Sequence, residues 1–293
     1  MSKVKDVKAV QPKQLSFNLG GLHFAAQEWG KKGQLPVLAL HGWLDNSSSF
    51  TVLAPKLKNV HLVAVDLAGH GQSDHRLGAG PYNIWEDVGE IFAIADALGW
   101  QRFILLGHSR GGIISAIAAG TFPERVSHLA LIEGILPETY KAEDAPRQLA
   151  LSIRSVNVQM TKPLTLYRDK EAAITAREGG MFPLSHASAR VLTERGIKPI
   201  EGGFSWSTDP RLFAASSVKL LPEQMSAFID NIKAPVKLIL GEEGLPKLYP
   251  NFQTYLEKFP KIDTRLISGN HHLHMEQEVD EVAALLNDFF AAD

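Results

Sequence analysis

The sequence predicts an α/β protein with a doubly wound, mostly parallel sheet of eight strands and a helical cap inserted after the sixth strand. Apolar runs of strand length recur along the chain, and stretches with helical spacing lie between them. Continuous apolar runs are typical of parallel strands covered on both faces, and their alternation with helices implies right-handed crossovers. The alternation breaks in the middle of the chain, which indicates an insertion.

The expected elements follow one another in a simple order. Residues 15–29 indicate a hairpin of two strands that turns at Gly20-Gly21, because glycine adopts the positive φ angles of tight turns. Apolar residues recur at helical spacing over residues 88–98, and Gly99 follows as a stop. Six runs rich in valine, isoleucine and leucine supply the other strands, at residues 37–40, 62–65, 103–106, 129–132, 236–240 and 265–267.

The domain organisation follows from the interrupted segment. Residues 137–221 are helix-rich and irregular, with prolines and two Gly-Gly pairs. We therefore expect residues 1–136 and 222–293 to form the core domain, and residues 137–221 a mainly helical cap that covers the site and shapes its pocket.

Composition excludes several classes of function. The chain has 293 residues, of which 45% are hydrophobic. Its formal net charge of -2 gives no indication that it binds nucleic acid or an anionic membrane. It has no cysteine, which excludes disulfides and thiolate chemistry and is typical of a reducing compartment, so we expect a cytoplasmic protein. Residues 1–14 are lysine-rich, and we expect them to fray rather than to form a signal peptide or a membrane span.

The most informative motif is Gly107-His108-Ser109-Arg110-Gly111. It lies between the apolar run at 103–106 and a helix-like stretch at 113–119, which is the context of a nucleophile elbow. Such a sharp turn holds the serine in a strained conformation, and side chains two residues away on either side would collide. Ser109 is therefore the candidate nucleophile.

Further motifs end other expected strands. His41-Gly42-Trp43 follows the third strand, a loop with Asp66, Gly69, Gly71 and Ser73 follows the fourth, and residues 269–276 follow the last. Together with the elbow, over residues 20–135 and 222–293, they resemble the serine-nucleophile branch of the α/β-hydrolase superfamily. The resemblance implies a cofactor-independent hydrolase, with the Asp66 loop as architecture.

The candidate base is His271, because its surroundings are similar to the family's catalytic-histidine loop. In many relatives a second glycine precedes that histidine, and here the residue is Asn270, which also tolerates left-handed backbone. His272 is the alternate base. A metal site of His271, His272 and His274 is the weaker interpretation, since no second group of ligands lies nearby, and we expect no metal or cofactor. Structural roles are expected for three other histidines: His61, His70 and His108.

The acid departs from the commonest family pattern. Most relatives have an aspartate three residues after the glycine that ends the seventh strand, and that position here is Gly244. Two carboxylates remain as candidates. Glu243 lies one residue earlier, whereas Glu133 ends the sixth strand, where burial of a carboxylate is costly unless it has a partner. Glu133 is preferred, and Glu243 is the alternate.

The oxyanion hole is expected from two backbone amides. Arg110 supplies one, immediately after the nucleophile, and the resemblance gives the other to Trp43. Residues 47–49, three serines, are expected to form a helix N-cap rather than a second nucleophile. The cap segment 204–211, with two aromatic residues, either lines the pocket or forms a core of its own.

These residues predict a serine esterase acting on small to medium carboxylic esters, with Ser109, His271 and Glu133 as the triad. Thioester hydrolysis, carbon–carbon bond hydrolysis and perhydrolysis use the same triad and stay open. Epoxide hydrolysis and dehalogenation need an aspartate at the nucleophile position, and Ser109 therefore argues against both reactions. A ligand-binding receptor with little turnover, or a scaffold with a dead site, is the alternative from another class. The expected partner is a small-molecule ester without strong charge, with no nucleic acid and no membrane insertion; oligomeric state is not predicted.

Overall fold

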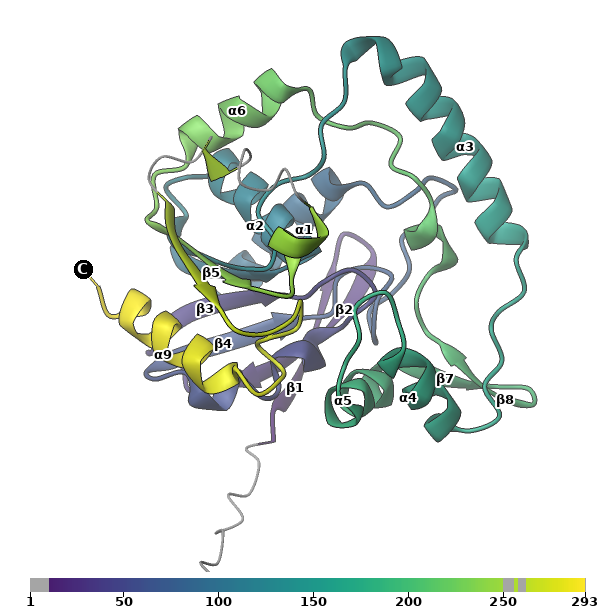
Figure 1. The fold of residues 1–293 in the computed structure, drawn as a ribbon, viewed down its shortest axis with the longest axis horizontal. Coiled ribbons are helices and arrows are strands. Elements are labelled where there is room, and N and C mark those ends of the chain that lie inside the picture. Colours follow the sequence, from purple (N-terminus) through teal and green to yellow (C-terminus); the bar gives the residue numbers. More distant parts are fainter. Residues whose placement is uncertain (1–10, 250–255, 258–261, 293) are drawn as a thin grey trace, which may run out of the picture.

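The central element is a sheet of eight strands in the order β1-β2-β4-β3-β5-β6-β9-β10 (Figure 1). The structure is a computed structural model and describes residues 11–249, 256–257 and 262–292. Only the pairings of β2, with β1 and with β4, are antiparallel, so the mostly parallel sheet is confirmed. The strands are β1 (Lys13–Leu19), β2 (Leu22–Trp29), β3 (Leu35–Leu40), β4 (Val60–Val65), β5 (Phe103–His108), β6 (Val126–Ile132), β9 (Val236–Gly241) and β10 (Ile262–Ile267).

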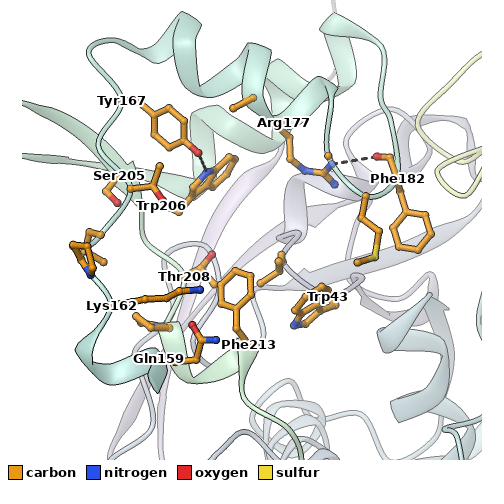
Figure 2. A pocket seen from close by; sticks show the side chains of 18 residues that line it. Trp43, Gln159, Lys162, Tyr167, Arg177, Phe182, Ser205, Trp206, Thr208 and Phe213 are labelled. Carbon is orange, nitrogen blue, oxygen red and sulfur yellow. Dashed lines mark hydrogen bonds between the residues drawn. The ribbon is translucent and has the colours of Figure 1, made fainter. Parts of the chain in front are cut away.

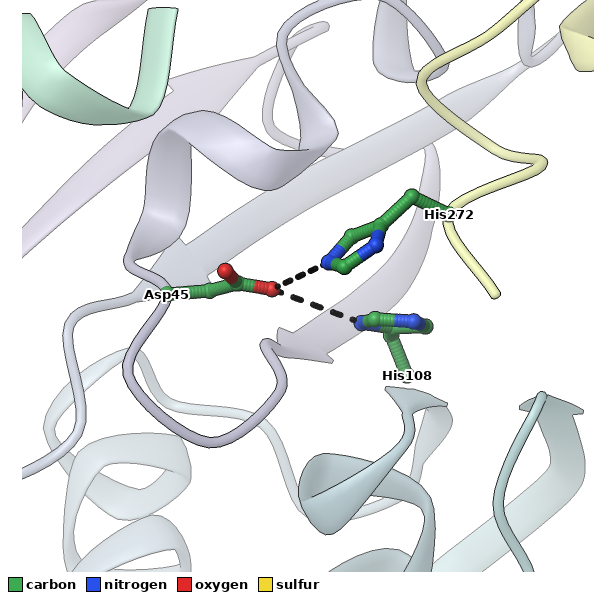
Figure 3. Close-up of side chains that lie close together, drawn as sticks. All are labelled: Asp45, His108 and His272. Carbon is green, nitrogen blue, oxygen red and sulfur yellow. Dashed lines mark hydrogen bonds and ion pairs between the residues drawn. The ribbon is translucent and has the colours of Figure 1, made fainter. Parts of the chain in front are cut away.

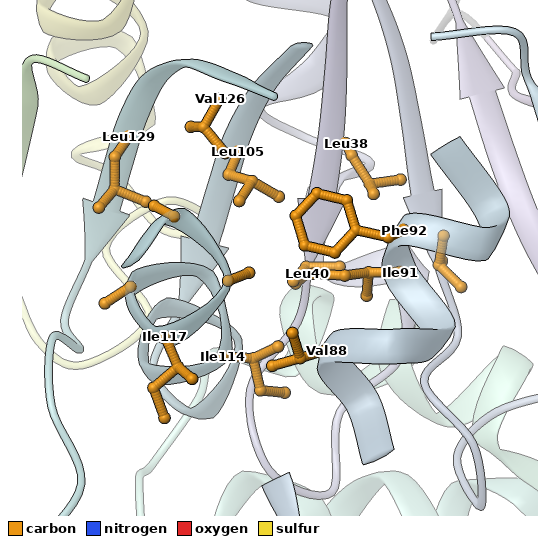
Figure 4. Packing of buried hydrophobic residues seen from close by; sticks show 14 of the residues in the cluster. Leu38, Leu40, Val88, Ile91, Phe92, Leu105, Ile114, Ile117, Val126 and Leu129 are labelled. Atoms are coloured by element: carbon orange, nitrogen blue, oxygen red, sulfur yellow. The ribbon is translucent and has the colours of Figure 1, made fainter. Parts of the chain in front are cut away.

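Helices cover both faces of the sheet. One face packs against the first hydrophobic cluster, in which Leu38 and Leu105 meet Ile91 and Ile114 of two neighbouring helices (Figure 4). The opposite face packs against a second cluster. Burial of this apolar surface is the main contribution to the stability of such a fold. The first face carries α1 (Ile84–Ala97), α2 (Arg110–Thr121) and α6 (Pro222–Asn231), and the second carries η1 (Ser47–Phe50), η2 (Ala54–Lys56) and α9 (Val279–Phe290).

Local sequence explains where the outer elements begin and end. Gly20 and Gly21 have φ angles of 59° and 79°, as the tight hairpin between β1 and β2 requires. Helix α1 begins after Asn83, whose backbone amide donates to Glu86 Oε2 at 3.2 Å. It stops before Gly99, which has a φ of 76°. The expected hairpin and helix are therefore confirmed.

The segment 137–221 adds no strand to the main sheet. It contains a two-stranded hairpin that the expected mainly helical cap did not include. Pro199 lies in this hairpin, where an isolated pair of strands tolerates a residue without a backbone donor. Its elements are η3 (Ala142–Asp144), α3 (Ala145–Thr161), α4 (Lys170–Glu178), α5 (His186–Gly196), β7 (Ile197–Ile200), β8 (Gly203–Trp206) and η4 (Pro210–Phe213).

Two smaller expectations need correction. Lys13 and Gln14 pair with β2 instead of fraying, while residues 1–10 of that expected segment lie outside the described residues. The three serines at 47–49 lie inside η1, and Asn46 caps it by accepting a hydrogen bond from the Ser48 amide. Among the helices of the described residues, none has both the length and the apolar character needed to cross a bilayer.

Candidate active site

The nucleophile elbow lies between β5 and α2. Ser109 has φ 50° and ψ -117°, a strained conformation for a residue with a side chain. A Cβ at Gly107 would overlap the backbone of Gly111, and a Cβ at Gly111 would overlap the carbonyl of Leu40. The glycines are therefore required by close backbone approach, and the turn presents Ser109 at the carboxyl end of the sheet.

Glu133 and His271 meet at the same end of the sheet. His271 Nδ1 lies 3.0 Å from Glu133 Oε2, and both side chains are buried. The amides of Gly241 and Leu245 each donate to the Glu133 carboxylate at 2.7 Å. A carboxylate accepts, so His271 Nδ1 donates and the neutral ring keeps its lone pair on Nε2.

Gly244 explains how Glu133 fits. A Cβ at Gly244 would overlap the carboxylate of Glu133. The position at which most relatives have an aspartate thus lacks a side chain, and the Glu133 carboxylate lies beside it. The structure brings this carboxylate, arriving from β6, to the place where an aspartate after β9 would begin.

The two alternates lie apart from this pair. The side chain of Glu243 is 61% exposed and forms an ion pair with Lys247. His272 points elsewhere, with its Nε2 3.1 Å from Asp45 Oδ2. Of the sequence-predicted acids and bases, the structure therefore brings together Glu133 and His271, and it places Glu243 and His272 in other contacts.

Burial sets the electrostatics of the pair. It raises the pKa of Glu133 to about 7, although the amides of Gly241 and Leu245 oppose the rise. Burial also lowers the pKa of His271 to about 3, and the neighbouring His272 adds to this. Both effects disfavour the imidazolium form, so His271 is neutral at neutral pH, as a general base must be.

The loop after β3 lies beside the elbow. His41 fixes it, because Nδ1 donates to the Gly42 carbonyl at 2.7 Å and Nε2 accepts from the Leu67 amide at 3.0 Å. In the part of the chain that the structure describes, the amides of Trp43 and Arg110 donate no backbone hydrogen bond. Both predicted oxyanion donors are therefore available to a ligand.

A pocket of about 410 Å³ lies between this loop and the segment 137–221 (Figure 2). Trp43 lines it and holds the insertion, because its Nε1 donates to the Leu212 carbonyl at 3.0 Å. Phe182 also lines it and stacks on His271, with ring centroids 3.9 Å apart. Of the aromatics expected at 204–211, Trp206 lines the pocket. Ser109, Glu133 and His271 are not among its lining residues. The pocket adjoins the His271 loop through Phe182 and the candidate oxyanion loop through Trp43.

Comparison with known proteins places this geometry in a family. A family model described as the alpha/beta hydrolase fold matches residues 36–155. Serine hydrolase-like protein 2 of Homo sapiens is 33% identical over 288 residues, which cover 91% of this chain and 90% of that protein. The chain belongs to the α/β-hydrolase family.

Two solved structures support the same membership. A hypothetical protein from Pseudomonas aeruginosa PAO1 superposes with a TM-score of 0.90 at 38% identity, over 97% of this chain and 100% of that one. A thioesterase domain from the curacin biosynthetic pathway superposes with a TM-score of 0.81 at 25% identity, over 95% and 98% of the two chains. Together with the serine hydrolase-like relative, these likenesses support a hydrolase.

One buried cluster of this hydrolase was not anticipated. Asp45 Oδ2 lies 3.1 Å from His272 Nε2 and 3.7 Å from His108 Nδ1 (Figure 3). These three residues have the donor types of a zinc site. However, Arg177 Nη2 donates to Asp45 Oδ1 at 2.8 Å and lies 3.5 Å from His272 Nε2, so a guanidinium already supplies positive charge there. We interpret the cluster as a hydrogen-bonded network.

This network links the insertion to the candidate catalytic loop. Burial alone would raise the pKa of Asp45, but His272 and Arg177 hold it well below its ordinary value. His108 Nε2 donates to the His271 carbonyl at 2.8 Å. Asp45 had a sequence signal, since it is a polar residue in the loop after a buried strand. Arg177 had none, because it lies 132 residues away along the chain.

The loop after β4 forms a second link to the insertion. Asp66 Oδ1 accepts a hydrogen bond from the Ser47 amide at 2.7 Å, and Oδ2 accepts one from Arg195 Nε of α5 at 2.9 Å. His61 and His70 lie in buried structural contacts, with Glu28 and with the Ala68 carbonyl. These contacts are in keeping with the architectural roles expected for this loop and for the two histidines.

Proposed function

We propose that this hydrolase is a serine esterase that cleaves small to medium carboxylic esters through an acyl-enzyme intermediate. Ser109 is the nucleophile, His271 the general base and Glu133 the acid that orients it. The observation that carries the proposal is the 3.0 Å contact between His271 Nδ1 and the buried Glu133. This pair lies at the carboxyl end of the sheet, where the strained turn at Ser109 follows β5. A buried carboxylate at this place has no other evident purpose.

Acylation follows from the protonation states. Because Glu133 holds the Nδ1 proton, His271 Nε2 accepts the proton of the Ser109 hydroxyl while Oγ attacks the ester carbonyl carbon. The amides of Trp43 and Arg110 stabilise the resulting oxyanion. The imidazolium then gives its proton to the alkoxide leaving group as the carbon–oxygen bond of the ester breaks.

Deacylation repeats the sequence with water. His271 takes a proton from a water molecule, the hydroxide attacks the acyl carbon, and the Ser109 oxygen leaves with the proton that His271 returns. The buried carboxylate of Glu133 stabilises the imidazolium in both halves of the reaction. The net reaction consumes one ester and one water and releases an acid and an alcohol.

In this proposal, the segment 137–221 is a cap, and residues 1–136 and 222–293 form the core domain. A pocket of about 410 Å³ with a mostly apolar lining is of a suitable size for a small to medium ester. Thioester hydrolysis is the second candidate, because the 25% identical neighbour is a thioesterase domain. It would use the same triad.

Hydrolysis of a p-nitrophenyl ester series from short to long acyl chains tests the proposal. The wild type should turn over some of the series, and Ser109→Ala should lose on the order of 10⁴-fold or more in kcat/KM. Ser49→Ala is the matched control, because it removes another serine hydroxyl that lies beside a histidine. Ser49 Oγ is 2.7 Å from His274 Nε2, and both residues are fully buried, so a substrate cannot reach them. A Ser109→Ala variant as active as the wild type would overturn the proposal.

A further inference from the structure

The pocket wall has an uneven charge. Among its eighteen lining residues there are two cations, Lys162 and Arg177, and no carboxylate (Figure 2). The whole chain has 32 acidic and 30 basic residues, so its overall composition does not account for this. The local excess of positive charge belongs to the pocket.

The chain segment beside the pocket has the same bias. Residues 145–168 run along α3 and into the pocket wall, and they contain four cations and no aspartate or glutamate. These cations are exposed, but Arg168 pairs with the adjacent Asp169 at 3.0 Å, and of the four only Lys162 lines the pocket. The four are Arg147, Arg154, Lys162 and Arg168.

The two pocket cations differ in how they are paired. Arg177 is paired with the buried Asp45 at 2.8 Å, so its charge is largely compensated. Within the described residues, no carboxylate lies at ion-pair distance from Lys162. The positive charge of Lys162 is therefore not neutralised by an ion pair and can attract a bound anion. The rest of the pocket lining is mostly apolar.

We propose that the natural substrate is an apolar ester that bears a carboxylate group, and that Lys162 binds this group in the pocket. The inference rests on the proposed esterase function. A pocket lined mainly by apolar residues takes the body of such a substrate, and one uncompensated cation sets its orientation. The charge attraction strengthens once the bound substrate excludes water. Lys162 is thus a specificity-determining residue and takes no part in the chemistry.

The test compares pairs of esters in which one member bears a carboxylate and the other a neutral group at the same place. One pair is 4-(butanoyloxy)benzoate and its methyl ester, which place the carboxylate on the alcohol side. The other pair is the mono-p-nitrophenyl ester of octanedioic acid and p-nitrophenyl octanoate, which place it on the acyl side. The wild type should prefer the charged member of at least one pair by roughly tenfold in kcat/KM, and less at high salt.

Variants then locate the preference. Lys162→Ala should remove most of the preference for the charged ester, and Lys162→Glu should reverse it. Lys198→Ala is the matched control, because Lys198 is an exposed lysine of β7 outside the pocket lining, and its preference should equal that of the wild type. A preference that persists in Lys162→Glu would overturn the inference.

Failure of the inference is distinct from failure of the proposed function. If the wild type hydrolyses the neutral and the charged members of both pairs with equal kcat/KM, the carboxylate inference is wrong, but the proposed esterase function is unaffected. If it hydrolyses no member of either pair faster than Ser109→Ala does, the esterase proposal is overturned and the inference with it.

Discussion

The two walls of the candidate site are built in different ways. On the core wall, Ser109 and Glu133 each follow a central strand and each have a φ of 50°, so the backbone itself fixes their positions. On the insertion wall, contact depends on single side chains, such as Phe182 stacked on His271 and Arg177 paired with Asp45. Backbone geometry thus positions the candidate catalytic residues, whereas a few side chains form the opposite wall of the pocket.

The same contrast appears in the packing. Most residues of the two large apolar clusters lie outside the segment 137–221, while a third cluster, which lies mainly within this segment, has five buried residues, of which Met275 comes from outside it. Helix α3 buries only Ser152 and Val156, and several of its large apolar side chains, such as Ile153, are about half exposed. We therefore expect the insertion to open more readily than the core, since local stability follows buried apolar contact.

The largest expected effect concerns the core wall. Glu133→Gln should lower kcat by about 10³- to 10⁴-fold, because a glutamine amide favours the wrong tautomer of His271. Glu243→Gln should stay within about twofold, since Glu243 is exposed and pairs only with Lys247. Kinetics on one p-nitrophenyl ester measures both. Equal losses in the two variants would break the assignment of the acid.

A stability effect is expected where the two walls meet. Arg177→Met leaves the Asp45 carboxylate buried with His272 as its remaining close partner, which should cost about 3–5 kcal/mol in the free energy of unfolding. Arg168→Met is the control, because the Arg168 side chain is 86% exposed and its pairing with Asp169 contributes little. Denaturant unfolding compares them, and equal stabilities would show that the walls are not coupled through Asp45.

The activity is expected to depend on pH through the two buried groups of the core wall. Activity needs neutral His271 and ionised Glu133, and burial raises the pKa of Glu133 to about 7 while it lowers that of His271. The acid loss of kcat/KM should therefore follow protonation of Glu133 as the pH falls through about 7. A pH–rate profile from 5 to 9 tests this, and Glu133→Gln should lack that limb. An unchanged limb in the variant would assign it to another group.

The same ionisation has a consequence for stability. Folding raises the Glu133 pKa from 4.5 to about 7, so the folded state binds this proton more tightly than the unfolded state. The protonated Glu133 therefore contributes to the free energy of unfolding below pH 4.5, and this contribution of about 3 kcal/mol is lost as the pH rises to about 7. Relative to Glu133→Gln, the wild type should lose stability over this range in denaturant unfolding.

The smallest effect concerns the side chain of Trp43. Trp43→Phe keeps the backbone amide but removes the hydrogen bond from Nε1 to the Leu212 carbonyl, which contributes about 1 kcal/mol. We expect kcat to change by less than about threefold, with the larger change in KM. Steady-state kinetics separates the two parameters, and a large loss of kcat would mean that the indole also positions the oxyanion loop.

Much of the core wall was predictable from the sequence, because its signals are local. The strand runs, the hairpin at Gly20-Gly21 and the strand–turn–helix context of Ser109 each lie within a few consecutive residues. The sequence also left Glu133 and Glu243 as alternatives. It could not decide between them, since the reach of each carboxylate depends on how β6 and β9 lie side by side, and on the space at Gly244.

The insertion wall was less predictable, because its contacts are distant along the chain. The pairing of Arg177 with Asp45 spans 132 residues and has no local pattern. The hairpin of β7 and β8 was missed because Pro199 and two glycines are typical of irregular chain. The charge of the pocket likewise arises from residues that only the fold brings together.

Covalent trapping with a fluorophosphonate, followed by tryptic mass spectrometry, tests whether Ser109 is a nucleophile activated by His271 and Glu133. Trypsin releases residues 103–110 as one peptide in which Ser109 is the only serine. The account predicts one phosphonyl group on this peptide in the wild type, none in Ser109→Ala, and much slower labelling in Glu133→Gln. No adduct on this peptide, or equal labelling of all three proteins, would contradict it.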